Sequence, residues 1–196
     1  MCYHGTKMEL RLTDQIVKAK NWAELHHADH TYGNETFFRG HLAKVAALVE
    51  ECDPTNVPAI VAAWLHDLVE DTDIDLETVE EEFGSFVATV VDLVTDPEGE
   101  GWTRREKKRA LYEKFRDFEG SFRKDSAALV KLADRYVNHA KSIADINLSK
   151  MSMYIKEFPE FISVYGPPAV EAGHFSLWND LFDQFVRMNK LVDAYR

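Results

Sequence analysis

The residues best suited to chemistry in this chain are a histidine and an aspartate, His66-Asp67, which interrupt an apolar run from Ala59 to Glu70. We expect this run to form a helix that is apolar on most sides, and such helices lie at the centre of their domain. A carboxylate buried there is costly unless it is paired, hydrogen-bonded or bound to a metal. Taken alone, the pair is equally typical of an ion pair at a helix end.

Two more acidic residues follow one turn later. Glu70 and Asp71 are the i+4 neighbours of His66 and Asp67, so four ionisable groups share the end of this predicted helix. Anions are unfavourable at a helix C-terminus, and clustered carboxylates repel one another. A metal ion would resolve both problems, whereas the alternative is a solvated acidic helix end.

Two further candidate ligands lie on other predicted helices. His41 is near the start of an amphipathic segment over about 38–51, and Asp134 lies on the apolar face of another over about 126–143. Each by itself is more often a core or surface residue than a ligand. Together, two imidazoles and two carboxylates suit Mn²⁺, Fe²⁺ or Zn²⁺ better than Ca²⁺.

The elements that must position these residues are helices, because apolar residues recur mostly at three- and four-residue intervals. Turn signals at Tyr32-Gly33-Asn34-Glu35, Gly84, 96–101 and Gly166-Pro167-Pro168 separate them. The run 90–94 has strand propensity but no evident partner strand. The helices are predicted over about 13–29, 38–51, 59–70, 76–83, 86–94, 104–118, 126–143, 149–161 and 169–195.

We therefore predict an all-α fold, a single domain over residues 1–196 arranged as a helical bundle. Its motif-bearing core would cover about 13–145, with a C-terminal helical extension of about 149–196 packed on it. An apolar content of 45% in 196 residues is ordinary for such a domain.

Composition also limits location and partners. No apolar run approaches the roughly 18 to 20 residues that span a bilayer, and the N-terminus lacks the apolar segment of a secretory signal. Two cysteines, Cys2 and Cys52, make no disulfide framework. We expect a cytoplasmic monomer or homodimer with no membrane partner.

The net charge of −11 argues against binding to duplex nucleic acid, which depends on many Lys and Arg contacts. A small phosphorylated substrate is still compatible with this charge, because positive residues gather in the predicted helix that starts at Arg104-Arg105-Glu106-Lys107-Lys108-Arg109. As an exposed charged face, that run is more often simply solvated.

The candidate ligands stand in an order, His41, His66-Asp67 and Asp134, that resembles the H…HD…D motif of the HD superfamily of metal-dependent phosphohydrolases. Residues 62–72, AAWLHDLVEDT, are similar to the HDxxEDT motif of its RelA/SpoT-type (p)ppGpp hydrolase branch. Residues 131–138, KLADRYVN, are similar to that branch's KLADRxxN motif.

The likeness extends over about residues 23–138 and includes Phe83-Gly84 and Val94-Thr95-Asp96, which resemble the FG and VT stretches of the branch. The C-terminal part also resembles small stand-alone bacterial and phage members. The resemblance therefore implies an all-helical HD hydrolase that removes the 3′-diphosphate from a guanosine polyphosphate.

The resemblance also implies roles for individual residues. One Mn²⁺ would be held by His41, His66, Asp67 and Asp134, and such an ion can lower the pKa of bound water from 15.7 towards about 7. Glu70 and Asp71 would orient this water and carry protons. Substrate contacts are expected from Tyr32, Arg104, Arg105, Lys131, Arg135 and Asn138. For Lys131 and Arg135, pairing with the acidic cluster is an equally good interpretation.

Two departures from the branch keep the substrate open. Leu42 follows the first histidine where the branch usually has proline, and residues 30–35, HTYGNE, replace a basic segment that contacts substrate there. Nucleoside monophosphates, NADPH, and cyclic or oligonucleotides are therefore alternative substrates for a phosphatase or phosphodiesterase on this scaffold. A non-catalytic nucleotide-binding module is the third interpretation.

Three further histidines, His26, His27 and His30, cluster at the end of the first predicted helix. A second metal site is one interpretation of them. Surface or hydrogen-bonding roles are the favoured one.

Overall fold

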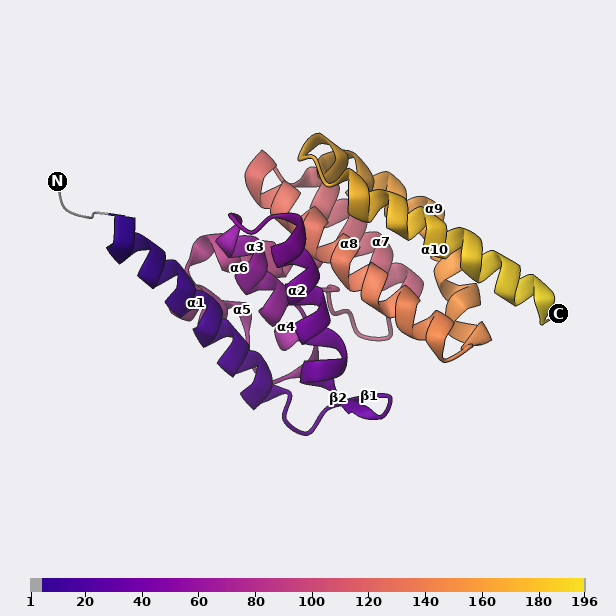
Figure 1. The fold of residues 1–196 in the computed structure, drawn as a ribbon, viewed down its shortest axis with the longest axis horizontal. Helices are drawn as coiled ribbons and strands as arrows, with labels where there is room; N and C mark the ends of the chain where they lie inside the picture. Colours follow the sequence, from indigo (N-terminus) through magenta and orange to yellow (C-terminus); the bar gives the residue numbers. More distant parts are fainter. Residues whose placement is uncertain (1–4, 196) are drawn as a thin grey trace. The chain divides into compact units, whose positions relative to one another are not determined.

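The computed structural model describes residues 5–195, with side chains from Thr13 onward. Within these residues the chain is helical apart from one pair of two-residue strands, which confirms the all-α prediction (Figure 1). It forms two compact units, one up to Thr95 and one from Asp96 onward. None of the described helices is long and apolar enough to cross a membrane.

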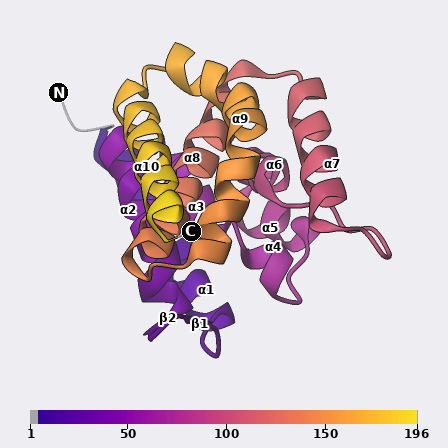
Figure 2. The ribbon, with the colours of Figure 1, turned by 90° about the vertical axis from the view of Figure 1, so that its right-hand side faces the viewer.

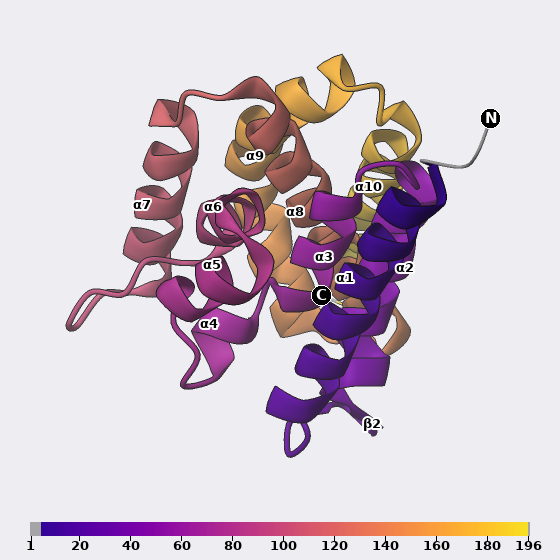
Figure 3. The same cartoon turned by 90° about the vertical axis from the view of Figure 1, so that its left-hand side faces the viewer.

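The N-terminal unit is built around a short buried helix, α3. Every residue of α3 except Pro58 is buried, and Asn56 caps the helix by accepting a hydrogen bond from the Ala59 amide, as the sequence predicts. Helices α1, α2 and α6 pack on α3 (Figure 3). The unit consists of α1 (Gly5–His26), β1 (Thr31–Tyr32), β2 (Glu35–Thr36), η1 (Phe38–Leu42), α2 (Ala43–Cys52), α3 (Val57–Leu65), α4 (Leu68–Asp71), α5 (Leu76–Phe83) and α6 (Ser85–Val94).

Two of the predicted helices are interrupted where the candidate ligands lie. The helix expected over 59–70 ends at Leu65, and a separate turn, α4, starts after Asp67, so the prediction of one continuous helix was wrong. The helix expected over 38–51 begins with a π-helical turn, η1, that contains His41. Such π-helical turns occur frequently at functional sites.

A small hairpin joins α1 to η1. The predicted turn is present, with Gly33 at a φ of 67°, but the antiparallel pairing of Tyr32 with Glu35 was not predicted. The run 90–94 is part of α6, so its strand alternative was wrong.

The C-terminal unit consists of α7 (Arg104–Asp117), α8 (Ser121–Ala144), α9 (Leu148–Glu171) and α10 (Phe175–Ala194). Helices α8, α9 and α10 pack on one another, and α7 contacts α9 (Figure 2). One buried apolar cluster of this unit lies between α8, α9 and α10 and is formed by Ile143, Met151, Tyr154, Met188 and Val192.

The predicted break at Gly166-Pro167-Pro168 was wrong, because α9 continues through it to Glu171. Gly166 serves packing instead: a Cβ there would lie 1.8 Å from the Trp178 ring, so only glycine admits this contact. Beyond the last helical residue, Glu171, Gly173 has a φ of 94°, and the next amide, that of His174, donates back to the Ala169 oxygen at 2.9 Å. This is the hydrogen bond of a Schellman cap.

Candidate metal centre

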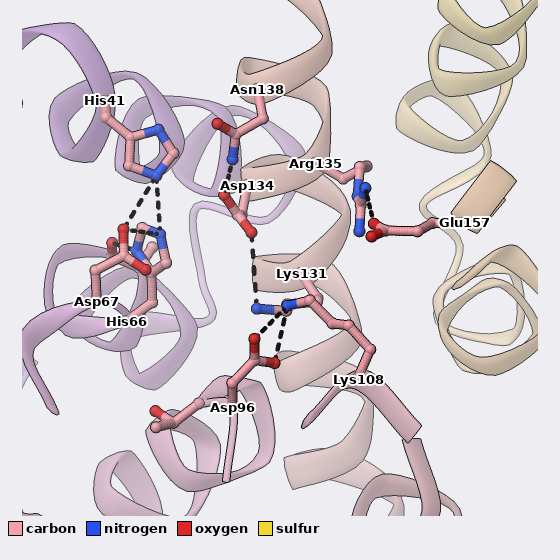
Figure 4. A network of polar contacts seen from close by, with 12 residues as sticks. His41, His66, Asp67, Asp96, Lys108, Lys131, Asp134, Arg135, Asn138 and Glu157 are labelled. Atoms are coloured by element: carbon pink, nitrogen blue, oxygen red, sulfur yellow. Dashed lines mark hydrogen bonds and ion pairs between the residues drawn. The ribbon is translucent and has the colours of Figure 1, made fainter. Parts of the chain in front are cut away.

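Three predicted ligands converge in the N-terminal unit. The Nε2 atoms of His41 and His66 lie 3.1 Å apart, and Asp67 Oδ2 is 3.2 Å from the first and 3.1 Å from the second (Figure 4). Both imidazoles are buried, whereas the Asp67 side chain is 19% exposed. Three donor atoms thus form a nearly equilateral triangle at the edge of the core.

The hydrogen bonding of His66 bears on whether the three donor atoms could bind a metal ion. Its Nδ1 lies 2.9 Å from the Ala63 carbonyl oxygen, so Nδ1 carries the proton that is donated, and whenever the ring is neutral its lone pair is at Nε2. In the neutral ring that lone pair faces the Asp67 carboxylate at 3.1 Å, and either a proton on Nε2 or a cation between the two atoms makes the contact favourable. Metal-binding imidazoles commonly donate their second N–H to a carbonyl in this way.

The spacing of the donors also fits a metal. Two ligand atoms about 2.0–2.1 Å from one ion stand about 2.9 Å apart at right angles and about 3.4 Å apart at the tetrahedral angle. All three observed separations, 3.1 to 3.2 Å, fall within this interval. The donor set therefore fits a divalent transition-metal ion.

Asp67 is held in its anionic form. Burial, the largest influence, would raise the pKa of Asp67, but the adjacent His66 and the hydrogen bonds from His41 and His66 lower it well below its usual value. A carboxylate that stays charged is the form that binds a cation.

The two predicted proton carriers, Glu70 and Asp71, lie on α4 and are exposed. Partial removal of water from around its carboxyl, and then the negative charge of Asp67, raise the pKa of Asp71 above its usual value. The structure therefore brings both acids onto the turn that follows the ligand Asp67.

Aromatic rings enclose His41. The ring of Tyr32 lies 5.1 Å from the His41 ring, and so does the ring of Phe37, a residue that the sequence did not single out. A Cβ at position 40 would lie 3.1 Å from the Tyr32 Cβ, so Gly40 lets the hairpin approach η1 closely. Tyr32 is thus placed beside a predicted ligand.

The fourth predicted ligand, Asp134, lies on α8 in the C-terminal unit. Asn138, one turn on, donates from Nδ2 to Asp134 Oδ1 at 2.5 Å, and the Lys131 ammonium lies 3.7 Å from Oδ2. Both neighbours fix the orientation of this carboxylate. That Asp134 shares a metal with the histidines stays a prediction.

A chain of charges leads from Lys131 to α7. Lys108 pairs with Asp96 at 2.7 Å, and both side chains are mostly buried (Figure 4). Burial, and then the positive charge of Lys131, lower the pKa of Lys108. Sequence analysis gave Asp96 no role, although it noted the Val94-Thr95-Asp96 stretch, because an ion pair to another helix leaves no local pattern.

The structure favours a packing role for Arg135 over substrate contact. Its guanidinium donates to Glu157 Oε2 at 3.0 Å and lies 4.8 Å and 4.5 Å from the ring centres of Tyr154 and Phe161. Glu157 Oε1 accepts a second hydrogen bond, 2.7 Å long, from Arg104. Glu157 thus joins α9 to α7 and α8.

Arg105 and Arg104 border a pocket of about 690 Å³ between α7 and α9, a size typical of small-molecule sites. Four basic side chains and two acidic ones line it. Its walls are formed by Arg104, Arg105, Lys108, Tyr112, Ser149, Ser152, Met153, Lys156, Glu157 and Glu160.

Comparison with known proteins agrees with this geometry. The HD domain family matches residues 19–155. The Haemophilus influenzae guanosine-3′,5′-bis(diphosphate) 3′-pyrophosphohydrolase is 30% identical over 166 residues, which cover 80% of this chain but 24% of that protein. The enzyme of the same name from Danio rerio, MESH1, is 33% identical over 134 residues, covering 67% of this chain and 71% of that one.

A solved structure, described as a metazoan orthologue of SpoT that hydrolyses ppGpp, has the same fold. Its TM-score is 0.67 at 23% identity, and the alignment covers 88% of this chain and 94% of that one.

Proposed function

Because the chain belongs to the HD domain family, we propose that it is a metal-dependent hydrolase that removes the 3′-diphosphate from a guanosine polyphosphate. In this reaction water attacks the phosphorus, and ppGpp is converted into GDP and pyrophosphate. The single observation that carries the proposal is the triangle of His41, His66 and Asp67, whose three ligand atoms lie 3.1 to 3.2 Å from one another.

We propose His41, His66 and Asp67 as ligands of one Mn²⁺, with Asp134 as the fourth ligand on the basis of the H…HD…D pattern. When bound, such an ion polarises a phosphoryl oxygen and makes water a better nucleophile at neutral pH. The hydrogen bond from Asn138 to Asp134 supports its part, because ligating carboxylates are usually oriented by neighbours.

Glu70 and Asp71 are the proposed proton carriers. A general base works best when its pKa lies near the operating pH, and the raised pKa of Asp71 moves it in that direction. Their exposure leaves both carboxylates accessible to a substrate and to water. Each would hold the attacking water and return a proton to the leaving ribose oxygen.

Base and phosphates would be held by different groups. The Tyr32 ring offers a stacking face beside His41, which suits guanine. Lys131 and Lys108 supply positive charge beside Asp134, and Arg105 extends it along α7. Both ammonium groups already have a carboxylate partner, Asp96 for Lys108 and Asp134 for Lys131.

The test is hydrolysis of ppGpp with added Mn²⁺, read by chromatography of the nucleotide and phosphate products. We expect GDP and pyrophosphate, lost in the double variant Glu70→Gln, Asp71→Asn and in His66→Gln. Arg109→Gln, which changes an exposed residue of α7 paired to Glu113, is the matched control and should keep full activity. If the metal-loaded protein does not hydrolyse ppGpp, the proposed substrate is wrong.

A second candidate function keeps the metal and changes the substrate. Residues 31–36 contain no basic side chain, and Glu35 pairs with Lys44 at 3.1 Å, so the hairpin offers no cationic contact for a diphosphate. Nucleoside monophosphates, NADPH and cyclic nucleotides therefore belong in the same assay. Orthophosphate or a linearised nucleotide as product would identify these activities. A cytoplasmic location and a monomeric or homodimeric state are further proposals, tested by fractionation and sedimentation.

A further inference from the structure

A second group of ligating side chains lies in the N-terminal unit. One ring nitrogen each of His27 and His30 and a carboxylate oxygen of Asp71 all lie within 4.8 Å of one another. His27 follows the end of α1, His30 precedes the hairpin, and Asp71 ends α4. Two imidazoles and one carboxylate are a ligand set that first-row transition ions accept.

Hydrogen bonding within the described residues links the two histidines to each other but leaves one buried ring nitrogen of His27 without a partner. The Nδ1 atoms of His27 and His30 face each other at 3.1 Å. His27 is fully buried, and its Nε2 has no hydrogen-bond partner among the side chains and backbone that the structure describes. Nε2 is not the nitrogen that faces His30, so the candidate ligand atoms of the two histidines are the Nδ1 atoms.

Local structure holds the two histidines in place. The His30 amide donates to the His27 carbonyl oxygen at 3.0 Å, and the Phe37 amide donates to the His30 oxygen at 2.9 Å. The Phe37 ring packs against His27 with the ring centres 5.1 Å apart. The third residue is anchored as well, because the Asp71 amide donates to the Asp67 oxygen at 2.9 Å. The ligand group is therefore preorganised by backbone hydrogen bonds.

We propose that His27, His30 and Asp71 bind a second divalent transition-metal ion, separate from the ion held by His41, His66 and Asp67. The separation of 3.1 Å between the two imidazole nitrogens lies in the interval of about 2.9 to 3.4 Å expected for two ligands of one ion. Three protein ligands leave positions open for water or for a phosphate oxygen of a substrate.

The two groups adjoin the same structural elements. Phe37 lies 5.1 Å from the rings of both His27 and His41, and Asp67 and Asp71 are one turn apart on the same segment. A second ion here would place additional positive charge beside the first centre, where a diphosphate needs it and the hairpin supplies none. Only this use of the ion rests on the proposed function. As a ligand through one carboxylate oxygen, Asp71 would keep its second oxygen for the proton-carrying role proposed above.

The experiment is a measurement of bound Mn²⁺ per chain, by calorimetric titration and by elemental analysis after stripping with chelator and reloading. The full chain is expected to bind two ions. His30→Ala, at a half-buried turn position, and Asp71→Asn should each bind one. Two matched controls, His26→Ala beside the group and Glu70→Gln beside Asp71, should each bind two.

His66→Ala distinguishes this proposal from the proposed function. One ion in this variant, together with one in His30→Ala, supports two independent sites. One ion in the parent chain and in His30→Ala, with none in His66→Ala, would overturn the second site and leave the first intact. Two ions in both His30→Ala and Asp71→Asn would also overturn it. Unchanged thermal unfolding of the metal-free His30→Ala variant would show that a lost ion does not reflect misfolding.

Discussion

The buried ion pair between Arg135 and Glu157 supports α8, the helix that carries Asp134, so its removal should cost stability. Glu157→Gln keeps the shape of the side chain and removes its charge. The two oxygens of Glu157 accept hydrogen bonds from Arg135 at 3.0 Å and from Arg104 at 2.7 Å. Arg135 is 5% exposed, whereas the Arg104 side chain is 48% exposed.

The expected magnitude follows from these exposures. Breaking a buried pair by removing one partner costs about 3 to 5 kcal/mol, while an exposed pair contributes at most about 1 kcal/mol. The rings of Tyr154 and Phe161 remain beside the Arg135 guanidinium and offset about 1 kcal/mol. We therefore expect the free energy of unfolding to fall by about 3 kcal/mol in Glu157→Gln.

Urea unfolding followed by circular dichroism measures this loss, with Glu160→Gln, an exposed residue of the same helix, as control. The pH dependence gives a second test. Burial, the largest influence, would raise the pKa of Glu157, but the hydrogen bond from Arg104 and the charge of Arg135 lower it below 4.5. A carboxyl whose pKa is lower in the folded than in the unfolded protein stabilises the folded state at pH values above its unfolded pKa. This contribution is lost as the pH falls through the pKa of the folded state.

The difference in the free energy of unfolding between the parent chain and Glu157→Gln should therefore reach its maximum above about pH 4.5 and become smaller below it. A loss under about 1 kcal/mol at neutral pH, equal to that of Glu160→Gln, would refute the reasoning. So would a large loss that does not change with pH, because the charge would then not be its cause.

Three other substitutions test the packing that positions the site. Gly166→Ala should destabilise by about 1 to 3 kcal/mol in thermal unfolding, because the new Cβ would lie 1.8 Å from the Trp178 ring; an unchanged Tm would show that this ring moves freely. Thr103→Ala removes the hydrogen bond from the Glu106 amide to the Thr103 hydroxyl and keeps the one from the Thr103 amide to the Glu106 carboxylate; it should cost about 1 kcal/mol in urea unfolding, an expectation that a neutral result contradicts. Burial lowers the pKa of His139 to about 3. Below about pH 6.5 the unfolded chain therefore binds a proton at His139 that the folded chain does not bind. The free energy of unfolding should decrease as the pH is lowered, by up to about 1.4 kcal/mol per pH unit. His139→Phe should flatten that slope between about pH 6 and 3, and a slope equal to that of the parent chain would assign the loss to other groups.

Interactions between residues close in the chain made several features of this protein predictable from its sequence. The helical period predicted α5 over its full length, and Asn56 before an apolar run predicted the cap of α3. His66-Asp67 in an apolar run predicted a candidate ligand pair, and in the structure His41 lies beside it, with the two Nε2 atoms 3.1 Å apart. These predictions succeed because caps, periodicity and burial of charge depend on neighbours a few residues apart.

Only the tertiary structure decided which distant side chains meet. No local pattern shows that α9 continues through Pro167, that Glu157 joins Arg104 to Arg135, or that His27 and His30 lie beside Asp71. The end of α3 before His66-Asp67 was not predictable either, because local helix propensity there would favour a continuous helix. Each of these features depends on contacts between residues far apart in the chain, and such contacts outweigh the small local preferences from which a sequence is interpreted.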